Sequence, residues 1–215
     1  MLPVTDTVPI DDNAIAGTLE RERHADAARV RDVLARAREL KGLEAADMAA
    51  LMGVSDPDLL RELFDTAQAV KQAIYGRRLV IFAPLYVSNM CANECTYCAF
   101  RARNNELERR ALTQEEIARE TRMLIDQGHK RVLLVAGESY PREGFSYVLK
   151  SIDTVYSVTH DQGEIRRINV NVAPLTLDQF RELKDAKIGT YQLFQETYHR
   201  PTYAAVHLAG KKKDY

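Results

Sequence analysis

The sequence lacks an excess of charge of either sign. Its 30 Lys and Arg residues nearly match its 31 Asp and Glu residues, which leaves a formal net charge of −1. Proteins that bind nucleic acid or anionic membranes usually carry a basic face, so we expect neither partner. The longest apolar run, residues 79–87, is interrupted by Pro84 and is shorter than the roughly 20 residues that span a bilayer. Residues 1–13 lack the apolar stretch of a signal peptide, so we expect a soluble, cytoplasmic protein.

Cysteine is scarce as well. The chain has three cysteines, Cys91, Cys95 and Cys98, and all of them lie within one short segment. An odd number of thiols so close together makes a poor disulfide framework, because a pair would close almost no chain and leave one thiol over. In a reducing compartment such a cluster more often binds metal or takes part in catalysis.

The N-terminal part shows polar sequence followed by helical periodicity. Residues 1–22 are polar and irregular, and we expect them to be poorly ordered. Residues 23–76 are predicted to form a helical lead-in, because apolar residues recur at helical spacing and glycines end the stretches. The predicted helices cover residues 25–40, 45–51 and 57–75.

After Gly76 the pattern changes to strands that alternate with helices. The run 79–87 is nearly all apolar and predicts a strand buried on both faces. Strand followed by helix, repeated about four times, is typical of parallel βα units. A closed barrel needs about 250 residues, so residues 77–215 form either an open α/β sheet or half of a barrel. The further predicted strands are 131–136, 165–172 and 190–194, and the predicted helices are 113–126, 147–156 and 176–184.

The three cysteines follow the first predicted strand, and functional sites of parallel α/β folds are built where strands end. Thiolates spaced Cys-x3-Cys-x2-Cys can each bind one iron of a cubane cluster. Because no fourth cysteine exists in the chain, one iron would remain free to bind a small molecule.

Two other interpretations of the cysteines stay open. A structural zinc site needs four ligands, and the fourth would have to come from a histidine brought near by the fold. Such a site would make the chain a non-catalytic metal-binding module. Inert buried cysteines are less consistent with the sequence, because the loop is rich in Asn, Glu and Thr. The histidines are all remote in sequence from the cysteines: His24, His129, His160, His199 and His207.

The motif Cys91-x3-Cys95-x-Tyr97-Cys98 resembles the signature of the radical S-adenosylmethionine (radical SAM) superfamily. The resemblance implies a TIM-type barrel of βα units, a 4Fe-4S cluster held by the three cysteines, and S-adenosyl-L-methionine on the free iron. It implies that the reduced cluster splits a C–S bond and releases a 5′-deoxyadenosyl radical, which takes hydrogen from the substrate. It also implies that Tyr97 lies against the adenine.

The resemblance implies a cofactor contact on the second predicted strand as well. Gly137 and Glu138 match the element that meets the amino group of the methionine moiety in this superfamily. Ala136 stands where the superfamily has a first glycine.

More of the chain resembles one group within the superfamily, the tyrosine lyases. Its members cleave the Cα–Cβ bond of L-tyrosine to p-cresol and dehydroglycine. One branch, the FeFe-hydrogenase maturases, continues to carbon monoxide and cyanide for H-cluster assembly, which implies hydrogenase maturation partners. The other branch is the 2-iminoacetate synthase of thiamine biosynthesis. The shared segments are residues 85–89, 128–131, 135–138, 169–174 and 195–199.

The two branches are not equally well matched. Residues 163–171 and 189–195 favour the maturase branch, which is our main interpretation, whereas residues 207–212 are closer to the thiamine branch. Polar residues at the ends of the later strands, Asn171, Gln195 and Glu196, are candidates for contacts to the cofactor or tyrosine. Capping of backbone groups is the alternative role for these three side chains. No residue is assigned a catalytic role.

Several residues near the motif carry no functional assignment. For the arginines after the cysteines, a solvated basic face is the favoured interpretation. For the aromatic residues near the end of the chain, buried packing is favoured over function. These residues are Arg101, Arg103, Arg109, Arg110, Tyr198, His199 and Tyr203.

The sequence also departs from the maturase pattern. Maturases hold an auxiliary iron–sulfur cluster with further cysteines in a C-terminal extension, and here no cysteine follows Cys98. Only about four βα units are present. We therefore expect the chain to be an N-terminal fragment that is catalytically impaired on its own.

Overall fold

The computed structural model describes residues 10–161 and 163–215. Contacts between residues divide the chain into two compact units, with the division between Leu79 and Val80. Within the described residues, no helix has both the length and the apolar character needed to cross a membrane.

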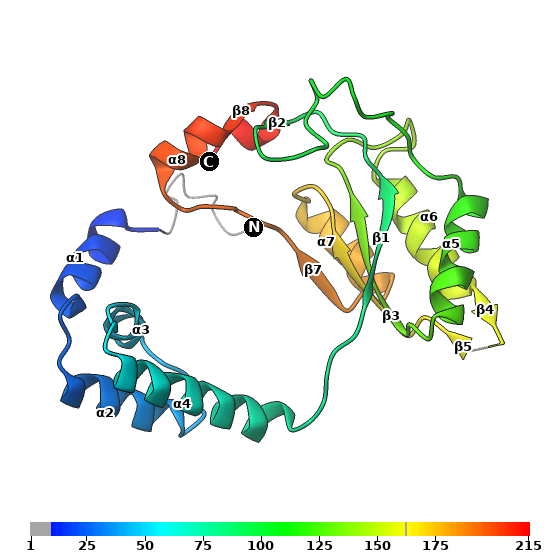
Figure 1. Ribbon diagram of the computed structural model, residues 1–215. Coiled ribbons are helices and arrows are strands. Elements are labelled where there is room, and N and C mark those ends of the chain that lie inside the picture. The colour runs from blue at the N-terminus through cyan, green and yellow to red at the C-terminus, as the bar shows by residue number, and fades with distance from the viewer. Residues whose placement is uncertain (1–9, 162) are drawn as a thin grey trace. The chain divides into compact units, whose positions relative to one another are not determined.

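The first unit is helical. It contains α1 (Asp12–Glu22), α2 (Ala27–Ala37), α3 (Ala45–Met52) and α4 (Pro57–Tyr75), as Figure 1 shows. The predicted helices correspond to α2, α3 and α4, and Asp56 caps α4 with Pro57 at its first position, as the sequence indicated.

Helix α1 corrects the prediction that the N-terminal segment is irregular. The Asp11 carboxylate accepts hydrogen bonds from the backbone N–H groups of Asn13 and Ala14, each at 3.0 Å, and so caps the helix. No residue of α1 is buried, and its large apolar residues are only Ile15 and Leu19, which is too few to mark a helix by periodicity alone. The part of the prediction that concerns residues 1–9 lies outside the described residues.

A buried carboxylate joins the helices of this unit. Asp47 is 2% exposed, and its oxygens accept hydrogen bonds from the guanidinium groups of Arg29, at 3.0 Å, and Arg36. The backbone N–H of Glu44 donates to the same carboxylate at 3.2 Å and completes a capping box for α3. Burial raises the pKa of Asp47, but these donors outweigh it and hold the pKa below the ordinary value.

The second unit is built on a four-stranded parallel sheet in the order β1-β3-β6-β7. Successive strands are joined through helices that lie on one side of the sheet (Figure 1). The predicted α/β class and the repeated βα units are confirmed, and within the described residues the sheet is open. The strands are β1 (Ala83–Ser88), β3 (Arg131–Ala136), β6 (Arg167–Asn171) and β7 (Thr190–Gln192), and the helices are α5 (Gln114–Asp126), α6 (Phe145–Ser157) and α7 (Leu177–Asp185).

Two helices of this unit begin at the predicted capping boxes, whereas α6 begins two residues before its predicted start at Tyr147. Thr113 and Glu116 form a capping box at α5, and Thr176 and Gln179 form another at α7. The core lies between the sheet and these helices, where Leu134, Ile117 and Ile152 are completely buried. This single layer of packing holds the carboxyl ends of the strands in place.

Strand β1 differs from its prediction. The apolar run was expected to be buried on both faces, but the strand begins only at Ala83, and residues 79–82 are exposed. Burial alternates from Ala83 to Val87, and Tyr86 is 56% exposed. The reason is that helices cover only one face of the sheet, so alternate side chains of this edge strand remain uncovered.

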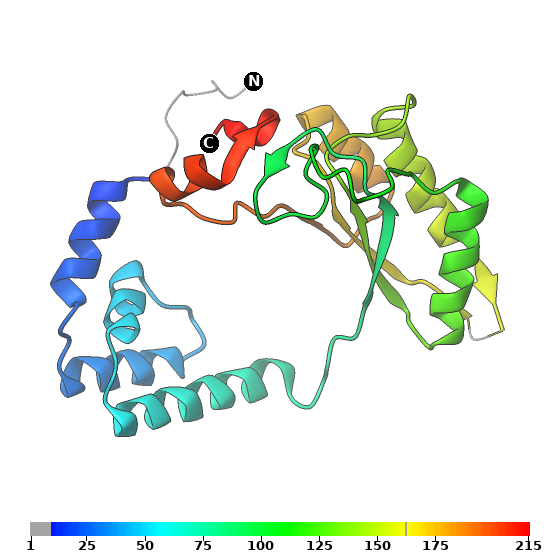
Figure 2. The same ribbon diagram turned by 45° about the horizontal axis from the view of Figure 1, so that its top comes forward.

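Several short elements had no counterpart in the sequence analysis. Strand β2 (Glu94–Cys95) pairs in antiparallel fashion with β8 (His207–Ala209), and Figure 2 shows the two side by side. Two- and three-residue strands carry no periodicity that a sequence pattern could reveal. The other new elements are the β4 (Thr159–His160) and β5 (Gly163–Glu164) pair, α8 (Arg200–Val206) and the 3-10 turn η1 (Lys211–Lys213).

We predict that Asp47→Asn destabilises the helical unit at neutral pH by roughly 1–3 kcal/mol, because two guanidinium groups lose a charged acceptor. The folded-state pKa lies below the unfolded value of about 3.9, so the ionised carboxylate stabilises the protein above that pH. This contribution is lost as the pH falls through the folded-state pKa. Thermal unfolding of both proteins between pH 7 and pH 2 measures the difference.

Glu62→Gln is the matched control, because Glu62 also pairs with an arginine, Arg31, but its side chain is 40% exposed. We expect a much smaller effect from this change. A difference between wild type and Asp47→Asn that stayed constant down to pH 2 would contradict the assignment.

Candidate functional site

The cysteine loop begins where β1 ends and runs against the loop that follows β3. The backbone N–H of Gly137 donates to the Ser88 carbonyl at 2.9 Å, and Ser139 N–H donates to the Met90 carbonyl at 3.1 Å. A Cβ atom at Gly137 would lie 2.3 Å from the Met90 oxygen. Glycine at 137 is therefore what lets the two loops approach so closely.

The middle of the cysteine loop is held by the C-terminal segment. Cys95 in β2 is the register partner of His207 in β8, and Thr96 N–H donates to the Val206 carbonyl at 2.9 Å. The backbone N–H of Cys98 donates to the Cys95 carbonyl at 3.1 Å, which turns the chain back toward the sheet. Residues more than a hundred positions apart thus form one structure around the thiols.

Arg109 fixes the ends of the loop. Its guanidinium donates to the carbonyl oxygens of Asn89 and Phe100, each at 2.8 Å, and to that of Arg101. The interpretation of the arginines as a solvated basic face is wrong for Arg109, which is half-buried and satisfies backbone acceptors of the loop. Arg110 instead pairs with Glu116 on the surface.

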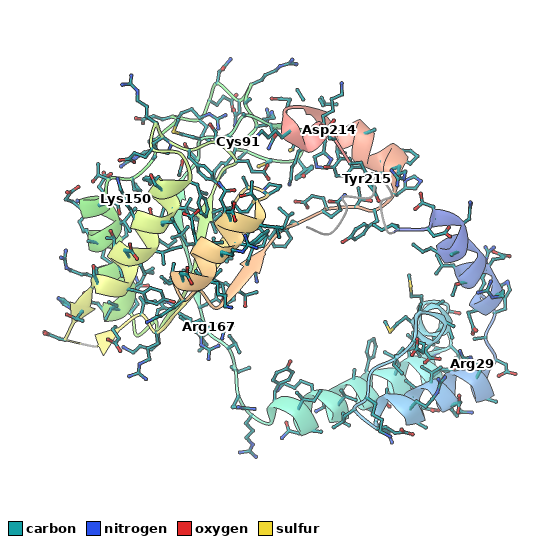
Figure 3. All side chains as sticks on the ribbon, turned by 180° about the vertical axis from the view of Figure 1, so that it is seen from behind. Arg29, Cys91, Lys150, Arg167, Asp214 and Tyr215 are labelled. Atoms are coloured by element: carbon teal, nitrogen blue, oxygen red, sulfur yellow. The ribbon has the colours of Figure 1, made fainter. Side chains whose placement is uncertain are left out.

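The loop faces a cavity of about 170 Å³ at the carboxyl ends of the strands. Figure 3 shows Cys91 and Asp214 at the same end of this unit. Gln195 does not line this cavity but a second one, of about 110 Å³, which shares Glu138 and Lys212 with the first. The predicted site residues that the first cavity brings together are Cys91, Cys95, Cys98, Tyr97, Gly137, Glu138, Asn171 and Glu196.

The three cysteines are free thiols. Cys95 is buried, whereas Cys91 and Cys98 are half-buried beside the cavity. Burial raises the pKa of the Cys95 thiol, while the positive charge of Lys212 lowers it. The charge of Lys212 therefore makes it easier for the Cys95 thiol to lose its proton when a ligand binds the sulfur.

The donor set fits an iron–sulfur cubane. Among the described residues, no three His, Cys, Asp or Glu side chains are grouped to hold one metal ion. A cubane makes a different demand, because each thiolate binds its own iron. Three free thiols on one cavity meet that demand.

The hydroxyl of Tyr97 is fixed by a buried histidine. It lies 2.8 Å from Nε2 of His207, whose Nδ1 lies 2.9 Å from the Tyr203 carbonyl oxygen. Since a carbonyl only accepts, Nδ1 carries the proton and Nε2 accepts from the tyrosine. Burial, together with the negative charges of Cys95 and Glu196, raises the pKa of Tyr97, so its hydroxyl stays protonated.

Glu138 lies at the centre of a polar network in the cavity. Its Oε2 accepts a hydrogen bond from the side-chain amide of Asn93 at 2.8 Å, and its Oε1 lies 3.8 Å from Nζ of Lys212. The same Nζ lies 3.9 Å from Oε1 of Glu196, whose backbone has a φ of 70°. A left-handed conformation at a residue with a side chain is uncommon and is often found at functional sites.

Asn171 reaches the cavity from the end of β6. The segment that follows is held by two tyrosines, because Tyr140 accepts from the Ala173 N–H at 3.1 Å and Tyr191 donates to the Ala173 carbonyl at 3.1 Å. Burial raises the pKa of both tyrosines to about 12. Both hydroxyls therefore keep their protons at neutral pH and hold the segment.

Sequence reasoning missed Asn93, Arg109 and Lys212 as site residues. Asn93 lies between two of the cysteines, and that position was the available signal. Lys212 lies in a run of three lysines, within the segment that resembles the thiamine branch. Nothing in the run itself distinguishes the lysine that enters the cavity from its neighbours.

Comparison with known proteins matches this chain to a family. The sequence model of the radical SAM superfamily matches residues 85–214. The 2-iminoacetate synthase of Escherichia coli strain K12 is 34% identical over 169 residues, which is 79% of this chain and 43% of that protein.

Solved structures give a similar result. The crystal structure of HydG, a maturase of the FeFe-hydrogenase, is 45% identical, with a TM-score of 0.92 over 96% of this chain and 45% of that one. HydG from Carboxydothermus hydrogenoformans is 39% identical, with a TM-score of 0.81 over 94% of this chain and 46% of that one. The chain thus spans less than half the length of these relatives.

We predict that Gly137→Ala lowers the iron content of anaerobically reconstituted protein several-fold. The added Cβ would overlap the Met90 carbonyl and lie 3.3 Å from Cβ of Cys91, so the cysteine loop must shift. Iron and acid-labile sulfide analysis measures the effect. Gly17→Ala is the control, because Gly17 lies within α1 with its nearest such contact at 3.4 Å. Wild-type iron content in Gly137→Ala would show that the close approach of the two loops is unimportant for metal binding.

Proposed function

The chain belongs to the radical SAM superfamily, and we propose that its cysteine loop holds a 4Fe-4S cluster that binds S-adenosylmethionine in a tyrosine lyase of the hydrogenase-maturase branch. One observation carries the proposal. Three free thiols line a single cavity together with Glu138, in a chain that has no fourth cysteine. Such a site leaves one iron of a cubane for a small ligand.

When bound, the cluster supplies the electron that splits a C–S bond of S-adenosylmethionine and so yields a radical that takes hydrogen from the substrate. The chain's own residues bind and orient. The Glu138 carboxylate accepts the ammonium of the methionine moiety, and Gly137 leaves room for the cysteine loop beside it. Tyr97 presents its ring to the adenine, with the hydroxyl held by His207.

Charge in the cavity supports a cationic ligand. Glu138 and Glu196 contribute two carboxylates and Lys212 one ammonium, so the group has a net negative charge. S-adenosylmethionine carries a sulfonium and an ammonium, which this field favours. Asn171 and Glu196 are proposed to contact the cofactor or tyrosine from the strand ends, and Gln195 is proposed to do so from the neighbouring cavity.

The maturase branch is supported by the identity of the chain to the two HydG structures, which extends over nearly all of its length. On this proposal L-tyrosine is the substrate. Its Cα–Cβ bond is cleaved to p-cresol and dehydroglycine, with onward formation of carbon monoxide and cyanide for the H-cluster. Hydrogenase maturation proteins would then be partners, and the cytoplasm the location.

The second candidate is 2-iminoacetate synthase of thiamine biosynthesis. It is supported by the E. coli relative and by the resemblance of residues 207–212 to that branch. A non-catalytic metal-binding module is the alternative from another class. The first two candidates differ in whether tyrosine carbon reaches carbon monoxide, and the third differs in metal content.

We predict that anaerobic reconstitution gives about four irons and a matching amount of sulfide per chain. Adding S-adenosylmethionine to the reduced protein should change its electron paramagnetic resonance spectrum. Cys91→Ser, Cys95→Ser and Cys98→Ser should each lose the cluster. One zinc per chain without sulfide would favour the metal-binding module. A cluster whose electron paramagnetic resonance spectrum does not change on addition of S-adenosylmethionine would overturn the proposed function.

We predict that tyrosine, S-adenosylmethionine and a strong reductant together yield p-cresol, in amounts low for an enzyme, because the chain spans less than half the length of its solved relatives. Chromatography detects the p-cresol, and carbon monoxide and cyanide assays separate the branches. Phenylalanine is the matched control substrate. Phenylalanine cleavage equal to that of tyrosine would contradict the assigned substrate, and carbon monoxide or cyanide among the products would exclude the thiamine branch.

A further inference from the structure

Lys212 enters the cavity from the C-terminal segment, unlike the lysines on either side of it. Its side chain is 18% exposed, and its Nζ lies between Oε1 of Glu138, at 3.8 Å, and Oε1 of Glu196, at 3.9 Å. Lys211 and Lys213 are exposed. These distances exceed those of a hydrogen bond, so Lys212 acts through its charge and leaves the carboxylate lone pairs available.

Asn93 connects the same lysine to the same glutamate. It is 2% exposed, its Nδ2 donates to Oε2 of Glu138 at 2.8 Å, and its Oδ1 accepts from the backbone N–H of Lys212 at 3.1 Å. The reversed orientation of the amide would bring oxygen against oxygen and N–H against N–H, so both contacts specify one orientation. Glu138 is therefore held at Oε2 by a hydrogen bond and at Oε1 by a charge.

The backbone around Lys212 is shaped for this contact. Gly210 has a φ of 85°, and a Cβ atom there would lie 2.4 Å from Oδ1 of Asn93. Only glycine tolerates both the conformation and the approach. The segment that contains Gly210 therefore packs against the cysteine loop, where Asn93 Oδ1 accepts the hydrogen bond from the Lys212 N–H.

The Lys212 ammonium attracts both the Glu138 and the Glu196 carboxylates. Glu138 and Glu196 both approach one ammonium in a partly enclosed cavity, where charges are screened less than at the surface. Without that ammonium the two carboxylates would repel each other, and only the hydrogen bond from Asn93 would hold the Glu138 side chain. The lysine thus sets the direction of the Glu138 oxygens before any ligand arrives.

We propose that Lys212 is a positioning residue that, with Asn93, holds the Glu138 carboxylate in the orientation that receives the ammonium group of S-adenosylmethionine. The proposal rests on the proposed function, because the ligand is the one assigned there. It adds a residue from the far end of the chain to the cofactor site.

The test compares Lys212→Met, which removes the charge and keeps an apolar stem, with Lys212→Arg and with Lys213→Met. Equilibrium dialysis of S-adenosylmethionine with anaerobically reconstituted protein gives the dissociation constant. We expect Lys212→Met to raise it about tenfold, as for the loss of one charged interaction. Lys212→Arg should restore most of the affinity, and Lys213→Met should match wild type.

Two further measurements separate positioning from folding. Iron content and hydrogen exchange of residues 206–213 should stay at wild-type values in Lys212→Met, because the backbone contact to Asn93 remains. Asn93→Asp places a carboxylate oxygen against Glu138 and should also raise the dissociation constant.

Each outcome decides the proposal. Equal or tighter binding of S-adenosylmethionine by Lys212→Met than by wild type overturns it, since tighter binding would mean that the lysine only repels the cationic ligand. So do equal losses of affinity in Lys212→Met and Lys213→Met, or iron loss and faster exchange in Lys212→Met that accompany the weaker binding, since these indicate a structural role. Failure of the wild-type, cluster-loaded protein to bind S-adenosylmethionine would instead overturn the proposed function.

Discussion

The site depends on one constraint: three thiols must face the same cavity although no covalent bond links them. Hydrogen bonds to the backbone satisfy it, with Arg109 gathering the carbonyls at the ends of the loop and β8 pairing with β2 at its middle. The loop after β3 contacts the same segment, because the Gly137 N–H donates a hydrogen bond to the Ser88 carbonyl. The groups that hold the loop in shape are therefore not the ones that would bind a metal.

The long elements were predictable because their signals are local. Thr113 with Glu116 marked the start of α5, and the spacing of the three cysteines was enough to propose the candidate site. The rest depends on contacts between distant parts of the chain. Neither the pairing of β2 with β8 nor the contact of Asn93 with Lys212 leaves a periodic trace in the sequence. Helix α1 was missed because its sequence offers only two large apolar residues at helical spacing, Ile15 and Leu19. The exposed side chains of β1 follow from a sheet that helices cover on one side only.

The two units place opposite charges together in different ways. In the helical unit Asp47 is satisfied by two arginines and a backbone donor, so the network is complete within the unit. In the cavity of the sheet unit, two carboxylates share one lysine at distances too long for hydrogen bonds. The first arrangement stabilises a fold, whereas the second leaves hydrogen-bond acceptor capacity on the carboxylates that the lysine does not use.

The pairing of β2 with β8 has a consequence for the order of events during synthesis. A ribosome makes Cys98 long before His207, so the thiols emerge without the segment that covers them. Until the later residues arrive, Cys95 lacks its antiparallel neighbour, and the nascent loop is open to oxidants. The pocket around the thiols is therefore complete only after translation has passed Lys212.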